Sequence, residues 1–182
     1  EINKIVKTFI KQRSLMRYLL IICILLWNLS GVAVAGPDKD QVLRMLEGRH
    51  WKLDIRAFNK LGDDADIILI EIAKNDSLMN VIRFRALEVL SLFPTDKTAS
   101  FLEDTAETEF TPMARRGFET MKRSFAKTKP ERVKHLATKL LKHRNANIRI
   151  SAARYIRFND QTLFKSFINT EKESWVRKAV QK

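Results

Sequence analysis

The chain has 182 residues, of which 45% are hydrophobic, and it contains only five Gly and four Pro. This length and composition suffice for a continuous buried core and exclude a disordered or loop-rich protein. The formal net charge is +13, but it is unevenly divided. Residues 36–114 carry 10 basic and 15 acidic side chains, whereas residues 115–182 carry 19 basic and 5 acidic ones. The second half is therefore the part expected to attract an anionic partner, unless its charge only solvates exposed helix faces.

Residues 1–35 have the three parts of a secretory signal. Lys and Arg side chains precede an almost wholly apolar stretch at residues 18–29, and the sequence Ala-Val-Ala follows at residues 33–35. Signal peptidase requires small residues three and one positions before the cut, so we expect cleavage after Ala35. The only cysteine, Cys23, lies in this leader. No disulfide is therefore expected in the rest of the chain.

This interpretation divides the chain in two. Residues 1–35 are an upstream extension and signal peptide, with Met16 as the expected start of translation, and residues 36–182 form the exported domain. After cleavage the domain is expected in the periplasm or outside the cell. The alternative is an uncleaved signal anchor in the inner membrane, although the run from Tyr18 to Ala35 is at the short end for a bilayer span.

Beyond the leader, apolar residues recur at helical spacing and are separated by short turn sequences. In chain order, the expected helices contain residues 38–48, 53–61, 67–75, 80–90, 99–106, 111–128, 133–141, 147–158, 163–167 and 174–182. A strand is not expected anywhere, because no stretch alternates apolar and polar residues with period two for long enough.

Side chains that can cap a helix stand at several of these boundaries. Asp38 is a candidate cap for the first helix, and Asn80 lies where a later one begins. Thr111 is followed by proline, which suits a cap and the first helical position. Thr128 and Glu131 have the spacing of a capping box, in which each side chain binds the other's free amide.

A three-residue pattern recurs along the chain: a small residue, a large apolar residue directly after it, and another three positions later. Its copies are Ala57, Phe58, Leu61; Ala86, Leu87, Leu90; Gly117, Phe118, Met121; Ala152, Ala153, Ile156; and a partial copy at Ala179 and Val180. The small residues allow two helices to cross closely, and the large ones fill the groove beside them. Repeats of about 30 residues are typical of stacked helical hairpins.

These repeats resemble the HEAT-repeat superfamily, in particular its short phycobilisome-lyase-type repeats. The matching residues are Ile82-Arg83, Ala86-Leu87, Leu90 and Asp96, then Ile148-Arg149, Ala152-Ala153, Ile156 and Asp160, with Val176-Arg177 as a weaker echo. The resemblance covers about residues 50–182. It implies an all-α fold, a right-handed α-solenoid of about four hairpins plus a terminal helix. It also implies a concave face lined by the second helices, usually for protein partners.

The copies differ most in charge. The first has Asp54 where later ones have Arg83 and Arg149, and the third has Ala114 at that position. We expect a specific function to depend on such variable exposed positions, whereas the recurring apolar residues are structural.

Residues for catalysis or metal binding are sparse. His135 and His143 share a predicted helix, but nearby lysines repel a cation and no further ligand is at suitable spacing. Gly62 with Asp63, Asp64 and Asp66 resembles part of a calcium loop without its later ligands, and helix capping explains these residues as well. We expect no catalytic residue, no metal site, no cofactor and no enzymatic activity.

The basic half offers a candidate binding surface instead. On the second helices the candidates are Arg132, Lys134, Lys139, Lys142 and Lys165. Further arginines belong to first helices, namely Arg115, Arg116, Arg123, Arg154 and Arg157. Tyr155 and Trp175 are aromatic neighbours of this charge, as a nucleic-acid platform requires, but their spacing also suits ordinary helix packing.

The predicted function is therefore an exported, non-catalytic HEAT-repeat scaffold that binds a protein or an anionic envelope component. A protein is the first expected partner. The alternative is a nucleic-acid-binding array that uses the basic C-terminal half. Contact with a membrane is expected only through the leader, if it stays uncleaved.

Overall fold

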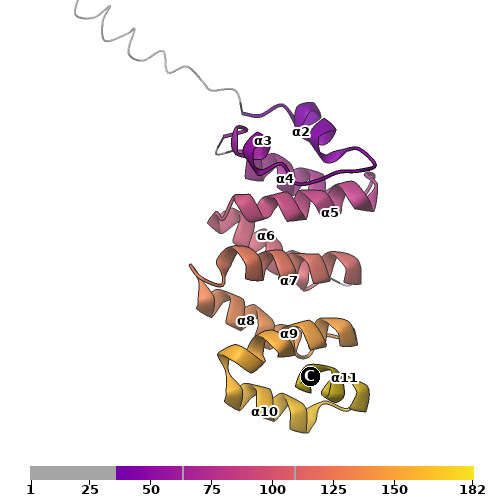
Figure 1. The fold of residues 1–182 in the computed structure, drawn as a ribbon, viewed down its shortest axis with the longest axis vertical. Helices are drawn as coiled ribbons and strands as arrows, with labels where there is room; N and C mark the ends of the chain where they lie inside the picture. The colour runs from indigo at the N-terminus through magenta and orange to yellow at the C-terminus, as the bar shows by residue number, and fades with distance from the viewer. Residues whose placement is uncertain (1–35, 63, 109) are drawn as a thin grey trace, which may run out of the picture. The chain divides into compact units, whose positions relative to one another are not determined.

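The computed structural model describes residues 36–182, except for residues 63 and 109. The predicted signal peptide, its start at Met16 and its cleavage at Ala35 lie outside the described residues. Within them the secondary structure consists of α-helices and one short 3-10 helix, without a strand (Figure 1). This confirms the predicted all-α class. None of the described helices combines the length and the apolarity that crossing a membrane requires.

Each stretch that the sequence predicts to be helical contains a helix. The helices are α2 (Lys39–Leu46), α3 (Ile55–Asn59), α4 (Ala65–Lys74), α5 (Asn80–Val89) with the 3-10 helix η1 (Leu90–Leu92), α6 (Asp96–Ala106), α7 (Thr111–Phe125), α8 (Pro130–Leu140), α9 (Ala146–Asn159), α10 (Gln161–Thr170) and α11 (Ser174–Gln181). The turn between α3 and α4 contains Gly62 with a positive φ of 83°, a conformation that glycine adopts without steric cost.

The helices of residues 36–182 pack mainly on their neighbours in sequence. The closest pairs are α4 with α5, α6 with α7, and α8 with α9. In addition, α5 contacts α7, α7 contacts α9, and α9 contacts α11, so these four helices form a row (Figure 1). Each helix of this row carries one copy of the recurring apolar pattern, with Leu90 in η1 directly after α5, and the first copy begins on α3.

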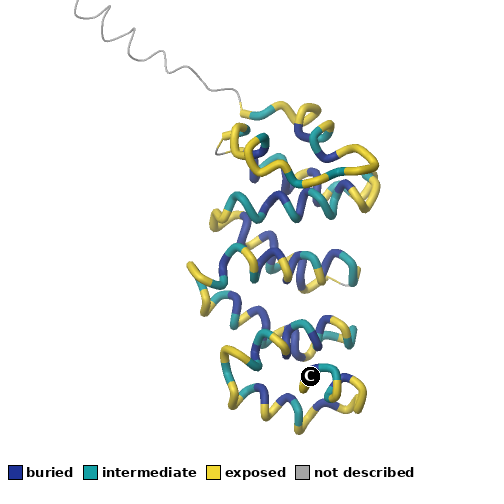
Figure 2. Tube along the Cα trace, viewed as in Figure 1, coloured by how far each residue is buried: buried dark blue, intermediate teal, exposed yellow. Residues whose placement is uncertain are grey.

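The core lies between the row and the helices behind it, and exposed residues gather at the turns (Figure 2). The members of the recurring pattern that are at most 1% exposed are Phe58, Ala86, Leu87, Leu90, Phe118, Met121, Ala152, Ala153, Ile156 and Val180. Ala57, Leu61 and Ala179, from the outer copies, are half-buried. The prediction that this pattern is structural is confirmed.

Gly117 shows why the first position of the pattern must be small. It lies on α7 where this helix crosses α6. A Cβ atom placed on it would come within 3.0 Å of Thr105 Cγ2 and 3.1 Å of the backbone nitrogen of Ala106. Both distances are too short for an unstrained contact, and the backbone of α6 cannot rotate away as a side chain does.

We expect Gly117→Val to lower the free energy of unfolding by about 2 kcal/mol, because the added atoms overpack the crossing of α6 and α7. Urea unfolding followed by far-UV circular dichroism measures the change. The matched control is Thr162→Val, which introduces the same side chain at an exposed position of α10. A stability of Gly117→Val equal to that of the control would contradict the close crossing.

The predicted helix caps are only partly correct. Asp38 caps α2, because its side chain accepts a hydrogen bond from the amide of Asp40. Asn80 and Thr111 are not caps, since each is already the first residue of its helix. The capping box at Thr128 is also wrong: α8 begins one residue later than such a box requires, and no side chain caps it.

Four caps were not predicted. The side chains of Asp54, Thr95 and Asp160 precede α3, α6 and α10, and each accepts a hydrogen bond from the amide three residues later. The side chain of Asn145 precedes α9 and accepts a hydrogen bond from the amide of Asn147. Asp54 therefore differs from the arginines of later repeats because it begins its helix, which accounts for its identity without a binding role.

Candidate anion-binding surface

The structure brings most of the predicted basic surface into ion pairs. Arg132 on α8 holds Glu103 of α6 with two parallel hydrogen bonds of 2.6 and 2.9 Å, and it also lies 3.2 Å from Asp96. Glu103 thereby raises the pKa of Arg132 above its ordinary value. A guanidinium engaged in this way has little hydrogen-bonding capacity left for a partner.

Of the other four predicted residues, two form ion pairs and two do not. Lys134 pairs with Asp160 at 2.9 Å and Lys139 with Glu107 at 2.9 Å, and these hydrogen bonds raise the pKa of both lysines. Lys142 and Lys165 are exposed and have no ion-pair partner among the described residues. The five cations therefore do not form one open basic surface, and their role in binding stays a prediction.

The arginine that recurs after Ile or Val also has a structural task. Arg83 donates to the carbonyl of Ala73, and Arg149 donates to the carbonyl of His143 at 3.0 Å. Arg177 donates to the carbonyl of Glu171. In each case the acceptor lies at or just beyond the end of the preceding helix, where carbonyls lack partners within the helix. The arginines at these variable positions therefore have a structural role, because each links two successive helices.

Arg149 additionally holds the turn between α10 and α11. Its Nε and Nη2 atoms lie 2.7 and 3.2 Å from the two carboxylate oxygens of Glu171, and Nη2 also donates to Glu173. The side chains of Arg149 and Glu171 are only 12% and 5% exposed. The hydrogen bond from Arg149 keeps the pKa of Glu171 below its ordinary value.

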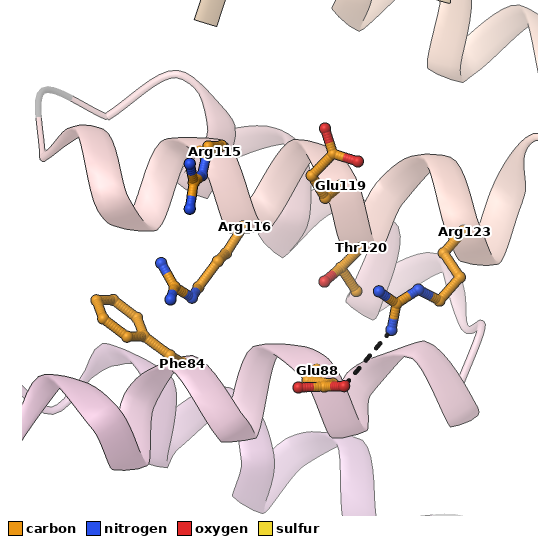
Figure 3. A pocket seen from close by; sticks show the side chains of 7 residues that line it. All are labelled: Phe84, Glu88, Arg115, Arg116, Glu119, Thr120 and Arg123. Atoms are coloured by element: carbon orange, nitrogen blue, oxygen red, sulfur yellow. Dashed lines mark ion pairs between the residues drawn. The ribbon is translucent and has the colours of Figure 1, made fainter. Parts of the chain in front are cut away.

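A more open basic site lies on the row of α5, α7 and α9. The first part is a hollow of about 410 Å³ between α5 and α7 (Figure 3). It is lined by Phe84, Glu88, Arg115, Arg116, Glu119, Thr120 and Arg123. Helical spacing explains this gathering, because Arg115, Glu119 and Arg123 follow one another at intervals of four residues along one face of α7.

A second hollow continues the first across α7 toward α9. It is lined by Arg115, Glu119, Lys122, Asn147, Ile150, Ser151 and Arg154. Because both hollows share Arg115 and Glu119, they form one strip across three helices. We name this strip, with the residues that line the two hollows, the arginine groove.

Arg116 is fixed in the groove by an aromatic ring. Its guanidinium carbon lies 3.8 Å from the ring centroid of Phe84 on α5, as Figure 3 shows, and its Nη1 donates to the carbonyl of Pro112 at 3.4 Å. Burial and the neighbouring positive charge of Arg115 lower the pKa of Arg116. A bound anion would relieve the repulsion between these two cations.

Arg115 is the most available cation of the groove, since it is exposed and has no hydrogen-bond or ion-pair partner among the described residues, although its charge helps to lower the pKa of Glu119. Arg123 lies 3.8 Å from Glu88, which is a long ion pair (Figure 3). Partial burial raises the pKa of Glu119, but hydrogen bonds from Lys122 and Ser151 outweigh this effect and the pKa lies below its ordinary value. The groove therefore contains two engaged carboxylates beside the free guanidinium of Arg115 and three arginines that each keep some donors available.

The other candidate residues do not form a chemical site. His135 is exposed, and His143 accepts a hydrogen bond from the amide of Asn145 at 3.0 Å. Asp66 is buried and accepts a hydrogen bond from the hydroxyl of Thr95 at 2.6 Å. In the part of the chain that the structure describes, no three His, Cys, Asp or Glu residues are placed to hold a metal ion.

The aromatic residues of the basic half are engaged as well. Tyr155 meets Phe118 edge to face, with ring centroids 6.3 Å apart, and the indole nitrogen of Trp175 donates to Glu173. The aromatic neighbour in the groove is instead Phe84, which stacks on Arg116 and lies one repeat earlier in the acidic half.

Comparisons of the chain with protein-family models, with curated proteins and with solved structures find no match.

Proposed function

We propose that residues 36–182 form a right-handed α-solenoid of HEAT-like hairpins that serves as a non-catalytic binding scaffold. Three features support this architecture. The buried pattern recurs on α3, α5, α7, α9 and α11, helices one repeat apart are in contact, and a recurring arginine ties the links α4–α5, α8–α9 and α10–α11. Such arrays present an extended surface to a partner. Export to the periplasm is part of the proposal and depends on the sequence of the leader.

The binding surface of this scaffold is the arginine groove, and its ligand is an anionic group of a protein or of an envelope component. The observation that supports this best is Arg115, which is exposed and has no hydrogen-bond or ion-pair partner among the described residues, beside the ring-stacked Arg116. A planar guanidinium with free donors binds carboxylate or phosphate with two parallel hydrogen bonds. Three of the five candidate cations predicted on the second helices, in contrast, are already paired with carboxylates.

A nucleic-acid-binding array is the second candidate function. The stacking of Arg116 on Phe84 favours it, because flat cationic and aromatic groups also bind bases. Two carboxylates, Glu88 and Glu119, line the same groove and oppose a dense row of phosphates. A basic second half attracts nucleic acid from a distance whichever partner the groove accepts.

Heparin-affinity chromatography tests the location of the anion-binding surface. We expect the double variant R115E/R123E to elute at a clearly lower salt concentration than K142E/K165E, although both change the net charge equally. The reason is that an anion bound in the groove contacts the first pair directly, whereas the second pair acts only through net charge. Elution of both variants at the same salt concentration, or earlier elution of K142E/K165E, would contradict the proposed surface.

A further inference from the structure

We infer that the arginine groove binds an extended acidic segment of another protein, in which carboxylate side chains stand about three residues apart. This inference rests on the proposed anion-binding function and specifies its ligand. It depends on where the charges of the groove lie and on which of them are already paired.

The free positive charge is concentrated at separate points along the groove. Arg115 has all its donors available. Arg116 stacks its guanidinium on the ring of Phe84 and donates one weak hydrogen bond to a carbonyl. Across α7, Arg154 on α9 gives one Nη2 hydrogen bond to the carbonyl of Ala179 and is otherwise exposed. Cations thus come from two adjacent helices of the row.

Negative charge alternates with these cations. Glu88 lies between Phe84 and Arg123, and Glu119 lies between the two hollows, held by Lys122 at 2.8 Å and Ser151 at 2.6 Å. A ligand that crosses the groove therefore meets acidic groups at fixed points. Duplex DNA carries one charge for about every 1.7 Å of its axis and cannot avoid them.

A peptide can match this alternation. Packed helices lie about 8–10 Å apart, and an extended chain advances about 3.3 Å for each residue. Two carboxylates about three residues apart would therefore face α7 and then α9, while the neutral residues between them pass Glu119. Phe84 also lines the groove and is partly exposed, so it offers an apolar contact that a peptide can use and a phosphate backbone cannot.

Fluorescence anisotropy with three labelled probes tests this inference. The first probe is a 12-residue peptide with Glu at every third position and neutral residues between; the second has the same composition with its Glu residues in one block; the third is a 20-base-pair DNA duplex. We expect the first to bind at least about fivefold more tightly than the second and than the duplex. We also expect R115Q to weaken its binding about tenfold, and the matched control K165Q less than twofold.

The possible failures are distinguishable. Tighter binding of the duplex, weakened by R115Q, would overturn the acidic-segment ligand and leave the anion-binding groove in place. Equal binding of the two peptides would overturn the spacing. Equal losses in R115Q and K165Q would show that net charge alone acts. If no probe binds even at low salt, the proposed function itself fails.

Discussion

Replacing Arg149 by Met is expected to lower the free energy of unfolding by about 3 kcal/mol, which is the scale for removing one partner of a buried ion pair. The carboxylate of Glu171 is 5% exposed and would keep its charge without the two hydrogen bonds from Arg149. The carbonyl of His143 would also lose its donor. Urea unfolding followed by circular dichroism measures the loss.

The double variant R149M/E171Q separates the buried charge from lost packing. A neutral amide at position 171 still accepts a hydrogen bond from the amide of Glu173 but leaves no unpaired charge, so we expect it to recover part of the loss. The control Lys165→Met removes an exposed positive charge and should unfold at nearly the wild-type urea concentration. If R149M behaves like this control, Arg149 does not hold the turn between α10 and α11.

The pKa of Glu171 gives the same contact a pH dependence. Because its pKa is lower in the folded chain than in the unfolded chain, the stabilisation is fully present above the unfolded value of about 4.5. It is lost as the pH falls through the folded value. The stability difference between wild type and R149M should therefore shrink on acidification below about pH 4.5, and a difference that grew there would contradict the ion pair.

Phe118→Ala is the second variant with a large expected effect. It should lower the free energy of unfolding by about 4 kcal/mol, because it leaves a cavity in the centre of the row. Phe118 is fully buried on α7, meets Tyr155 of α9 edge to face, and lies beneath the ammonium group of Lys122 at 4.9 Å. The loss thus weakens the contact between two helices of neighbouring repeats. Thermal and urea unfolding both report it.

Phe158→Ala is the matched control, since it deletes the same ring at a position that is 81% exposed. Its effect should stay within about 0.5 kcal/mol. Equal losses in the two variants would show that Phe118 is not central to the packing. A loss at Phe118 accompanied by weaker binding of the acidic peptide would show further that the groove depends on the correct spacing of α7 and α9.

The helices and the core were predictable because they depend on periodicity, which a single sequence displays. The residues Ala86, Leu87 and Leu90 are buried as their repetition indicates. The caps were less predictable, since a cap depends on whether one residue lies just outside a helix. Asn80 misses that place by one position, and Asp160 occupies it.

The candidate site was harder to predict, because charge counts do not show which charges meet. Arg132 and Lys139 look available in the sequence, yet their partners Glu103 and Glu107 stand about one repeat earlier in the acidic half. Arg115 was named among the arginines of the first helices, but it was not one of the five candidates for the binding surface. A sequence signal for the groove is Phe84, which lies 32 residues before Arg116 and places an aromatic ring on the facing helix.

The local character of these contacts also bears on the order of folding. Among the described residues, the hydrogen bond from Arg85 to the carbonyl of Leu46 spans 39 positions, and those from Arg132 to Glu103 and from Lys139 to Glu107 span 29 and 32. Closing such short loops costs little entropy, and topologies rich in local contacts fold quickly. Each hairpin needs only the preceding one as a template. The chain can therefore assemble progressively as it emerges from a ribosome or a translocation channel, without waiting for its C-terminus.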